Sequence, residues 1–413
     1  MGNLVVGQSG GPTAVINSSL VGVIKGALHF HIPKIYGMKN GIEGFLQGKI
    51  LDLKELFPNN EGLSLLKRTP SSFLGTCRYK LPPADGHEEV YEKVFQRLEE
   101  YDISYFLYIG GNDSMDTIQQ LSDYAAAHNK PQKFIGVPKT IDNDLPATDH
   151  TPGFGSAAKF IATTTKEIIR DTESYETSGP KISVIEIMGR NAGWLTGASA
   201  LSRSSDCVGP DLIYLPETDF VPEEFLSHVS DITKKKASIV IAVSEGIHTA
   251  DGKLVCESSG NATFTDAFGH TQLSGSGHVI ANLISNELGF KTRAIELSIL
   301  QRCATHLASR TDIDEAYNVG FEAVKAAIDG QTGKMITIEV VEREPYIAHY
   351  KAADIHGIAN EEKKVPLDWI TPDHNDVTED FLTYARPLIR GSMFPHFEDG
   401  IPKHATLYGP KDQ

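Results

Sequence analysis

Cysteine, tryptophan and long apolar runs are scarce in this chain of 413 residues. The four cysteines, at positions 77, 207, 256 and 303, form no CxxC pair and have no zinc-ligand spacing. That pattern favours reduced thiols, and so a cytoplasmic protein, over disulfides or structural zinc. No stretch of eighteen apolar residues occurs, and the amino-terminal segment lacks a basic start. We therefore expect neither secretion nor insertion into a membrane.

Basic residues are also fewer than acidic residues. The chain has 38 Lys and Arg against 54 Asp and Glu, a formal net charge of −16. Nucleic acids and anionic membranes attract basic patches, so the charge argues against both as partners. A local group of cations, or a bound metal ion, can still hold a small polyanion in an acidic protein.

Two common nucleotide-binding motifs, GxxxxGK[ST] and GxGxxG, are absent. Residues 8–17 (QSGGPTAVIN) lead instead from a strand-like run into a helical pattern. Gly10 and Gly11 lack Cβ atoms, so their backbone N–H groups can approach an anion closely at a helix amino terminus. A plain tight turn is the alternative interpretation.

What the chain does contain is a set of apolar, strand-like runs that each end in a loop of small and polar residues. These segments are residues 4–17, 105–114, 134–144, 182–190 and 239–246. An open α/β sheet gathers ligands outside the carboxyl ends of its strands, so the loops should converge on one cleft. Their glycines, acids and cations predict a phosphoryl-transfer site.

The order of the elements predicts an α/β fold. Strand and helix patterns alternate with short connections, which implies mostly parallel sheets with right-handed crossovers. The length suggests roughly two to three domains. We place the boundaries near residues 145 and 330, giving domains at 1–145 and 146–330 and a tail at 331–413. The tail should contain a strand, a short helix and irregular chain, and part of it should pack back on the first domain.

The loop KTIDND at residues 139–144 is the most informative feature. Asp142 and Asp144 can divide two tasks, one taking a proton from a hydroxyl and the other holding a metal or fixing the geometry. Lys139 can neutralise charge on a phosphoryl group. An Asx-turn is the structural alternative. In the GGNDS loop, Asp113 and more weakly Asn112 are candidate Mg²⁺ ligands, with a helix N-cap as the alternative.

Arginine and lysine residues supply candidate phosphate contacts. Arg190 of the MGR loop can bind phosphate with two parallel hydrogen bonds, which lysine cannot do. Lys181, Arg293 and Arg302 are three further candidates. Surface salt bridges are the alternative for each of them. Glu245 can accept hydrogen bonds from sugar hydroxyls, or it can be a solvated strand end.

Taken in order, GGxxS, TIDND, ISVxExMGR, SEG and TRA…QR resemble the phosphofructokinase family over residues 4–310. The resemblance implies two similar, doubly wound α/β domains with the active site between them. The first would be the larger, donor-side domain and the second the sugar-phosphate side. It also implies a homodimer or homotetramer, Mg²⁺ as cofactor, and phosphoryl transfer to O1 of fructose 6-phosphate in glycolysis or its reversal.

Matching positions imply a role for each candidate. Asp142 would be the base, Thr140 and Ile141 would touch the sugar, and Asp144 would support the metal or the geometry. The sugar would be held by Met188, Gly189, Arg190 and Glu245. Its 6-phosphate would be bound by Lys181, Arg293 and Arg302, some of them from a neighbouring subunit. The donor phosphate would meet Gly11, Arg78 and Lys139.

Two departures from the ATP-dependent relatives identify the donor. Those relatives have glycine at the positions of Asp113 and Lys139, which leaves room for an α-phosphate and a nucleoside. Asp113 would exclude an α-phosphate by volume and charge, while Lys139 could take over its neutralising role. The donor would then be inorganic pyrophosphate. The alternatives are an ATP-dependent enzyme, a non-catalytic regulatory subunit and, ranked far lower, a diacylglycerol or NAD kinase. Asn112 and Ile299 also depart from the family pattern.

Overall fold

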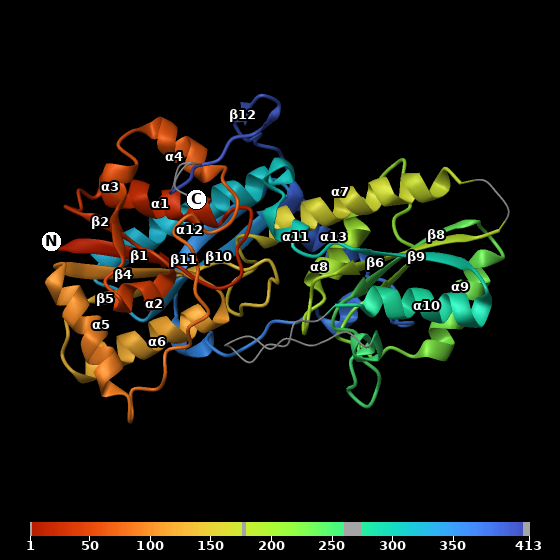
Figure 1. The fold of residues 1–413 in the computed structure, drawn as a ribbon, viewed down its shortest axis with the longest axis horizontal. Helices are drawn as coiled ribbons and strands as arrows, with labels where there is room; N and C mark the ends of the chain where they lie inside the picture. Colours follow the sequence, from red (N-terminus) through yellow and green to blue (C-terminus); the bar gives the residue numbers. More distant parts are fainter. Residues whose placement is uncertain (1, 176–178, 260–273, 408–413) are drawn as a thin grey trace.

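Two sheets, each flanked by helices, form the two lobes of the molecule (Figure 1). The computed structural model describes residues 2–175, 179–259 and 274–407. The arrangement confirms the α/β class and the mostly parallel sheets. Within the described residues, no helix combines the length and the apolar character needed to cross a membrane.

The larger sheet has seven strands in the order β11-β10-β5-β4-β1-β2-β3. The strands are β1 (Asn3–Gln8), β2 (Ile35–Met38), β3 (Ile50–Asp52), β4 (Ile103–Gly110), β5 (Lys133–Pro138), β10 (Lys334–Arg343) and β11 (Tyr346–Asp354). The four pairings from β10 across β5, β4 and β1 to β2 are parallel, while β3 and β11 add antiparallel edges. All residues of β1 are buried, as expected for a central parallel strand covered on both faces.

The smaller sheet is parallel throughout, in the order β7-β8-β6-β9. Its strands are β6 (Lys181–Ile187), β7 (Leu212–Tyr214), β8 (Ser238–Ser244) and β9 (Lys291–Glu296). The pattern of residues 291–302 taken alone predicts an extended segment, but strand β9 ends at Glu296 and the chain continues as the short helix α11 (Leu300–Cys303). A separate hairpin of β12 (Phe397–Glu398) and β13 (Ile401–Pro402) projects from the first lobe.

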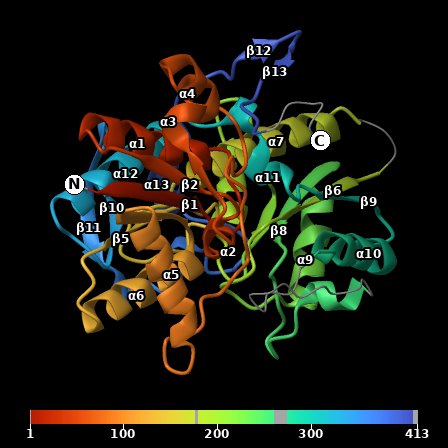
Figure 2. The same ribbon diagram turned by 60° about the vertical axis from the view of Figure 1, so that its left-hand side comes forward.

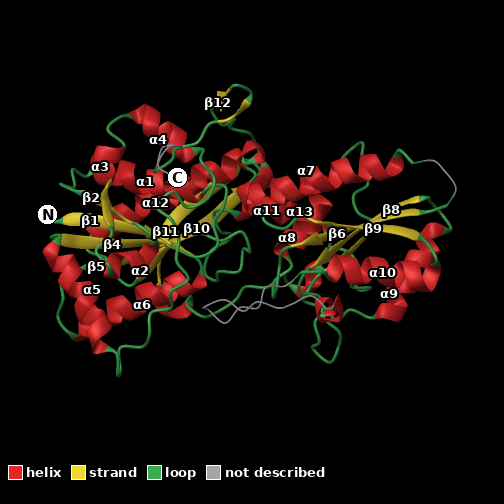
Figure 3. Ribbon diagram, in the orientation of Figure 1, coloured by secondary structure: helices red, strands yellow, loops and turns green. Residues whose placement is uncertain are grey.

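Helices cover both faces of each sheet (Figure 3). Around the larger sheet and its edge are α1 (Ile16–His29), α2 (Gly41–Leu46), α3 (Leu53–Leu56), α4 (Asn60–Lys67), α5 (Glu88–Glu100), α6 (Asn112–Ala127) and α12 (Arg310–Ile328). Around the smaller sheet are α7 (Phe154–Glu173), α8 (Trp194–Gly197), α9 (Pro222–Thr233), α10 (Ser276–Leu288) and α13 (Glu379–Ala385). The short helix expected in the tail is confirmed as α13.

Helices α1 and α12 pack at very short range. A Cβ atom added at Gly22 of α1 would lie 2.0 Å from the carbonyl oxygen of Tyr317 on α12. Only glycine fits at such a contact. This packing does not test the predicted domain boundaries. Helix α12 falls within the predicted second domain in sequence, but it lies against the first sheet. The tail also returns, because β10 pairs with β5.

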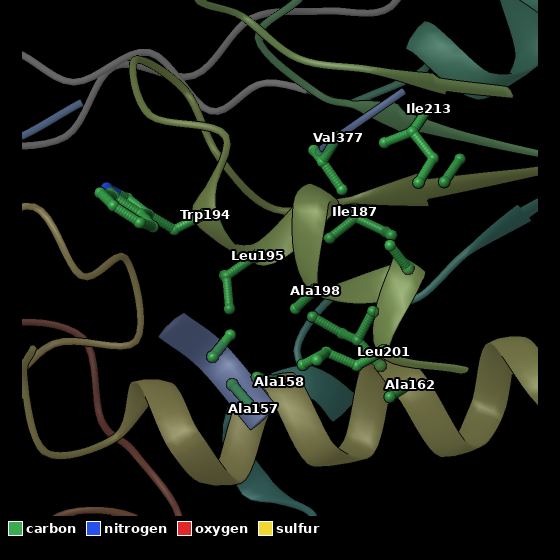
Figure 4. Packing of buried hydrophobic residues seen from close by; sticks show 14 of the residues in the cluster. Ala157, Ala158, Ala162, Ile187, Trp194, Leu195, Ala198, Leu201, Ile213 and Val377 are labelled. Carbon is green, nitrogen blue, oxygen red and sulfur yellow. The ribbon is translucent and has the colours of Figure 1, made fainter. Parts of the chain in front are cut away.

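The smaller lobe has its own apolar core. Ala157 and Ala158 of α7 face Leu195, Ala198 and Leu201, and small side chains let these segments approach closely (Figure 4). Phe381 of the tail helix α13 belongs to the same core. The chain therefore passes between the lobes more than once. The turned view shows β1 and β2 in one lobe and β6 and β9 in the other (Figure 2).

Candidate active site

A polar cleft of about 640 Å³ opens where the loops after β1, β4, β5, β6 and β8 meet. The predicted site residues that line it are Gly11, Arg78, Asn112, Asp113, Lys139, Thr140, Ile141, Asp142, Asp144, Met188, Gly189, Arg190, Glu245 and Arg302. Parallel strands present their carboxyl ends to the same edge, and this accounts for the convergence. The five loops of the sequence prediction therefore do share one cleft.

The loop after β5 joins the first loop of the chain through Lys139. Its ammonium donates a hydrogen bond of 2.7 Å to the carbonyl oxygen of Gly11. Its backbone N–H also donates to the carbonyl of Gly110, at 3.0 Å. The Lys139 side chain is almost fully buried, with 2% exposed. The cation is thus fixed among backbone groups of the loop that follows β1 and of the end of β4.

Asp142 lies in a short hydrogen-bonded turn. The Thr140 hydroxyl donates to its carboxylate at 3.1 Å, and the backbone N–H of Asp142 donates to the same hydroxyl at 3.1 Å. This is an ST-turn, in which the Thr140 hydroxyl accepts the backbone N–H, and not the Asx-turn of the structural alternative, in which an aspartate carboxylate would accept it. The turn fixes the direction of the Asp142 carboxylate, which is compatible with a catalytic role.

The middle residue of the motif, Asn143, is the residue that shapes the loop. It is fully buried and has a φ of +56°, a left-handed conformation that asparagine tolerates better than most residues. Its side chain donates to the Tyr384 hydroxyl at 2.7 Å and accepts from the Thr151 N–H at 3.1 Å. Asn143 therefore turns the two aspartates into the cleft.

Hydrogen bonds also join the loops that follow β6 and β8. The Gly189 N–H donates to the Glu245 carboxylate at 3.3 Å, and the Ser244 hydroxyl donates to the Gly189 carbonyl. A Cβ atom at Gly246 would lie 1.9 Å from the carbonyl oxygen of Arg190, so glycine is required there. The SEG segment therefore packs directly against the backbone of the MGR loop.

Burial raises the pKa of the acids in the cleft. The pKa of Asp142 is raised by burial, against the lowering effects of the Thr140 hydrogen bond and the Lys139 charge. Burial and the neighbouring charge of Asp142 raise the pKa of Asp144 to about 7. Burial similarly raises the pKa of Glu245 to about 7. Carboxyl groups with raised pKa values are better proton acceptors near neutral pH.

Burial lowers the pKa of two basic side chains in the cleft. Burial lowers the pKa of Lys139 to about 8, although the charges of Asp142, Asp144 and Asp113 oppose that shift and Arg302 adds to it. Burial, and then the charge of Arg78, lowers the pKa of Arg302. Positive groups are therefore crowded at this end of the cleft, which is a suitable environment for a polyanion.

The low pKa of Lys139 gives a pH prediction. The cation is present below about pH 8 and is lost as pH rises through that value. We expect kcat/KM for the phosphoryl donor to fall by about tenfold per pH unit above this point, because this ratio reports groups of the free enzyme. A pH profile of Lys139→Arg is the control, since arginine stays charged. An identical alkaline decline in both proteins would contradict the assignment.

Lys181 and Arg293 do not line the cleft. Lys181 starts β6, six residues before Ile187, so about 20 Å of strand separates it from the cleft end. Arg293 is exposed on the edge strand β9 beside Ser183. Within one chain these two residues are not part of the site, and their role across a subunit boundary stays a prediction.

Several cleft residues were not identified from the sequence. Lys80 follows Arg78 by two residues, and this pair of cations in one loop could have indicated that both residues line the cleft. Asn191 lies directly after the MGR motif. Asn360 and Glu362 come from the tail and carry no motif, so their presence in the cleft could not be inferred from spacing.

Comparison with known proteins agrees with this geometry. The Phosphofructokinase family model matches residues 3–327. The chain is 43% identical over 407 residues to pyrophosphate–fructose 6-phosphate 1-phosphotransferase of Halomonas elongata, covering 98% of this chain and 96% of that protein. It is 39% identical, at the same coverage, to the protein of that name from Methylococcus capsulatus.

A solved structure is similar over nearly the whole length. The pyrophosphate-dependent phosphofructokinase of Nitrosospira multiformis matches with a TM-score of 0.88 and 37% identity, covering 98% of this chain and 95% of that one. The family match spans most of the chain, and the relatives are similar over both lobes and the tail. This chain belongs to the phosphofructokinase family.

Proposed function

We propose that this chain catalyses the reversible transfer of a phosphoryl group from inorganic pyrophosphate to O1 of fructose 6-phosphate. The products are fructose 1,6-bisphosphate and inorganic phosphate. The observation that carries the choice of donor is the pair of side chains Lys139 and Asp113 in the cleft. The names of the similar proteins from Halomonas elongata and Methylococcus capsulatus agree with that choice.

The donor end of the cleft suits a short polyanion. Lys139 is held against the Gly11 carbonyl and gives a fixed positive charge close to the first loop. Asp113, at the start of α6, adds volume and negative charge where a nucleotide would need space for a further phosphate. Arg78 and Lys80 line the same cleft and add positive charge. Together these groups favour pyrophosphate over a nucleoside triphosphate.

In the chemical step, Asp142 accepts the proton of the sugar O1 hydroxyl. O1 then bonds to one phosphorus of pyrophosphate, and the bond from that phosphorus to the bridging oxygen breaks. The leaving group is inorganic phosphate. Lys139 and Arg302 stabilise negative charge on the transferring group and the leaving oxygen. Arg190, Met188 and the other sugar-side residues hold the acceptor in line with the donor.

The cleft residues also fit Mg²⁺. This ion needs only one or two protein carboxylates, because phosphate oxygens and water fill its other positions. Among the described residues no group of three or more His, Cys, Asp or Glu forms a closed metal site. We assign the role to Asp113 and Asp144, which both line the cleft. Bound Mg²⁺ would supply charge neutralisation on the donor phosphates.

A neighbouring copy would complete the sugar-phosphate pocket. Arg302 lies in the cleft of its own chain, whereas Lys181 and Arg293 lie at the far end of the smaller sheet. Strand β9 is an edge strand whose Lys291 and Arg293 are exposed. A homodimer or homotetramer in which these cations reach the 6-phosphate of the next subunit accounts for both facts.

The reverse reaction tests the proposal independently of the forward donor assay. Fructose 1,6-bisphosphate and inorganic phosphate, incubated with the protein and Mg²⁺, should yield fructose 6-phosphate and pyrophosphate, followed by ³¹P NMR. ADP supplied in place of phosphate should yield no ATP. Formation of ATP from ADP, with no pyrophosphate from phosphate, would contradict the proposal.

A further inference from the structure

Residues 360–364 of the tail, here called the strap, border the cleft between the lobes. Asn360 and Glu362 of the strap line the cleft together with the family motifs. In Figure 1 this part of the tail, drawn in blue, passes between the two lobes. The strap lies after β11, so it belongs to the region that no family motif covers.

One end of the strap is held by Asn112, at the start of α6. The Asn112 side-chain oxygen accepts the backbone N–H of Asn360 at 2.5 Å, and its amide donates to the carbonyl of Glu361 at 2.6 Å. The Asn360 side chain adds a hydrogen bond of 3.1 Å to Asp116, one turn further along α6. Asn360 has a φ of +64°, so the strap turns sharply at this anchor.

The other end of the strap is held by the catalytic loop and the smaller lobe. The backbone N–H of Lys363 donates to the carbonyl of Asp144 at 2.7 Å, and the indole N–H of Trp194 donates to the carbonyl of Lys363 at 2.9 Å. The Lys363 ammonium donates to the carbonyl of Asp149 at 2.8 Å and lies over the Trp194 ring. The side chain of Asn191 donates to the Glu362 carboxylate at 2.9 Å.

These contacts explain the amide at position 112. Its oxygen must accept a hydrogen bond from one strap residue while its nitrogen donates to the carbonyl of the next, Glu361. A carboxylate could accept but could not donate, and it would repel that carbonyl oxygen. Because both polar atoms of Asn112 are already engaged, the predicted metal-ligand role fits this residue less well than a strap contact does.

We propose that Asn112 is a positioning residue that fastens the strap across the cleft, and that the strap in turn holds Asp144 and the loop of Asn191 in register with the donor loop. This proposal rests on the proposed function for its kinetic consequence only. The hydrogen bonds link the donor loop, the catalytic loop and the sugar-side loop through one short segment. Asn112 itself lies in the donor loop beside Asp113, so its loss should disturb the donor end of the site first.

Asn112→Asp is the direct test, and it changes only the donating atom and the charge. Hydrogen–deuterium exchange of the strap peptide, measured without substrate, should become at least tenfold faster because the Lys363 N–H loses its protection. Trypsin should cleave after Lys363 once the strap is loosened, because in the docked strap its ammonium donates to the backbone carbonyls of Thr148 and Asp149. The KM for pyrophosphate should rise about tenfold, with the KM for fructose 6-phosphate changed less than twofold.

Asn318→Asp is the matched control. It also removes an amide donor, here to the Tyr350 hydroxyl, but on α12 and outside the cleft. Asn112→Ala should loosen the strap as Asn112→Asp does. Unchanged exchange and proteolysis in both Asn112 variants would overturn the proposal. So would tighter Mg²⁺ binding with a faster reaction in Asn112→Asp, because that is the result of a metal ligand. The exchange and proteolysis experiments do not depend on the identity of the donor.

Discussion

Asp142→Asn is expected to lower kcat by ~10²–10⁴-fold, the usual range for loss of a general base. Asparagine has nearly the same shape and can still accept the Thr140 hydrogen bond, so the turn should remain intact. It cannot take the proton of the O1 hydroxyl. The KM for fructose 6-phosphate should change much less, because other residues hold the sugar. Steady-state kinetics in the forward direction measures both quantities.

A surface substitution gives the baseline for this result. Asp314→Asn removes a carboxylate that pairs with Lys67 and Arg310, outside the cleft. Such surface pairs contribute little to stability, so turnover should be close to that of the parent. If Asp142→Asn also retained turnover within a few-fold of the parent, the base would be a different residue.

Lys139→Met should lower kcat with pyrophosphate by ~10²–10³-fold, the effect found when one preorganised electrostatic contact to a transition state is removed. Methionine is similar in length, so the loss reports the charge. The ammonium lies against the Gly11 carbonyl, where it can reach the donor. Lys133→Met is the matched control, since Lys133 lies at the opposite end of the same strand, β5. Equal losses in both variants would show a general effect of the substitution.

Asp113→Gly tests whether the Asp113 side chain excludes ATP from the donor end of the cleft. It opens space and removes a negative charge from the route of an α-phosphate, so use of ATP should rise. Use of pyrophosphate should fall in the same variant, because a proposed Mg²⁺ ligand is lost. The ratio of kcat/KM for the two donors measures the change. A ratio that does not move would show that Asp113 has no part in donor selection.

Much of the fold was predictable because local patterns and packing agree. The strands β1, β4, β5, β6 and β8 are apolar runs followed by polar loops, and parallel pairing places their ends together. The hairpin strand β11 was not predicted. Its residues alternate between half-buried and exposed on the edge of the sheet. Such a pattern is a weak sequence signal for a strand. The short helices α2 to α4 also lack a clear period.

The cleft was predictable where its chemistry lies in motifs, and not where it depends on tertiary contacts. KTIDND and MGR carry their own signals. By contrast, Glu362 reaches the cleft only because residues far apart in the sequence, Asn112 and Asn191, hold its segment. Asn143 was visible as part of a motif, but its structural role follows from a buried contact with Tyr384, more than two hundred residues away.

The unmodified protein can show whether pyrophosphate or ATP is the phosphoryl donor. Fructose 6-phosphate and Mg²⁺ are supplied with pyrophosphate or with ATP in separate assays, and formation of fructose 1,6-bisphosphate is measured. We expect sustained turnover with pyrophosphate and little or none with ATP. Comparable or faster turnover with ATP would contradict this expectation.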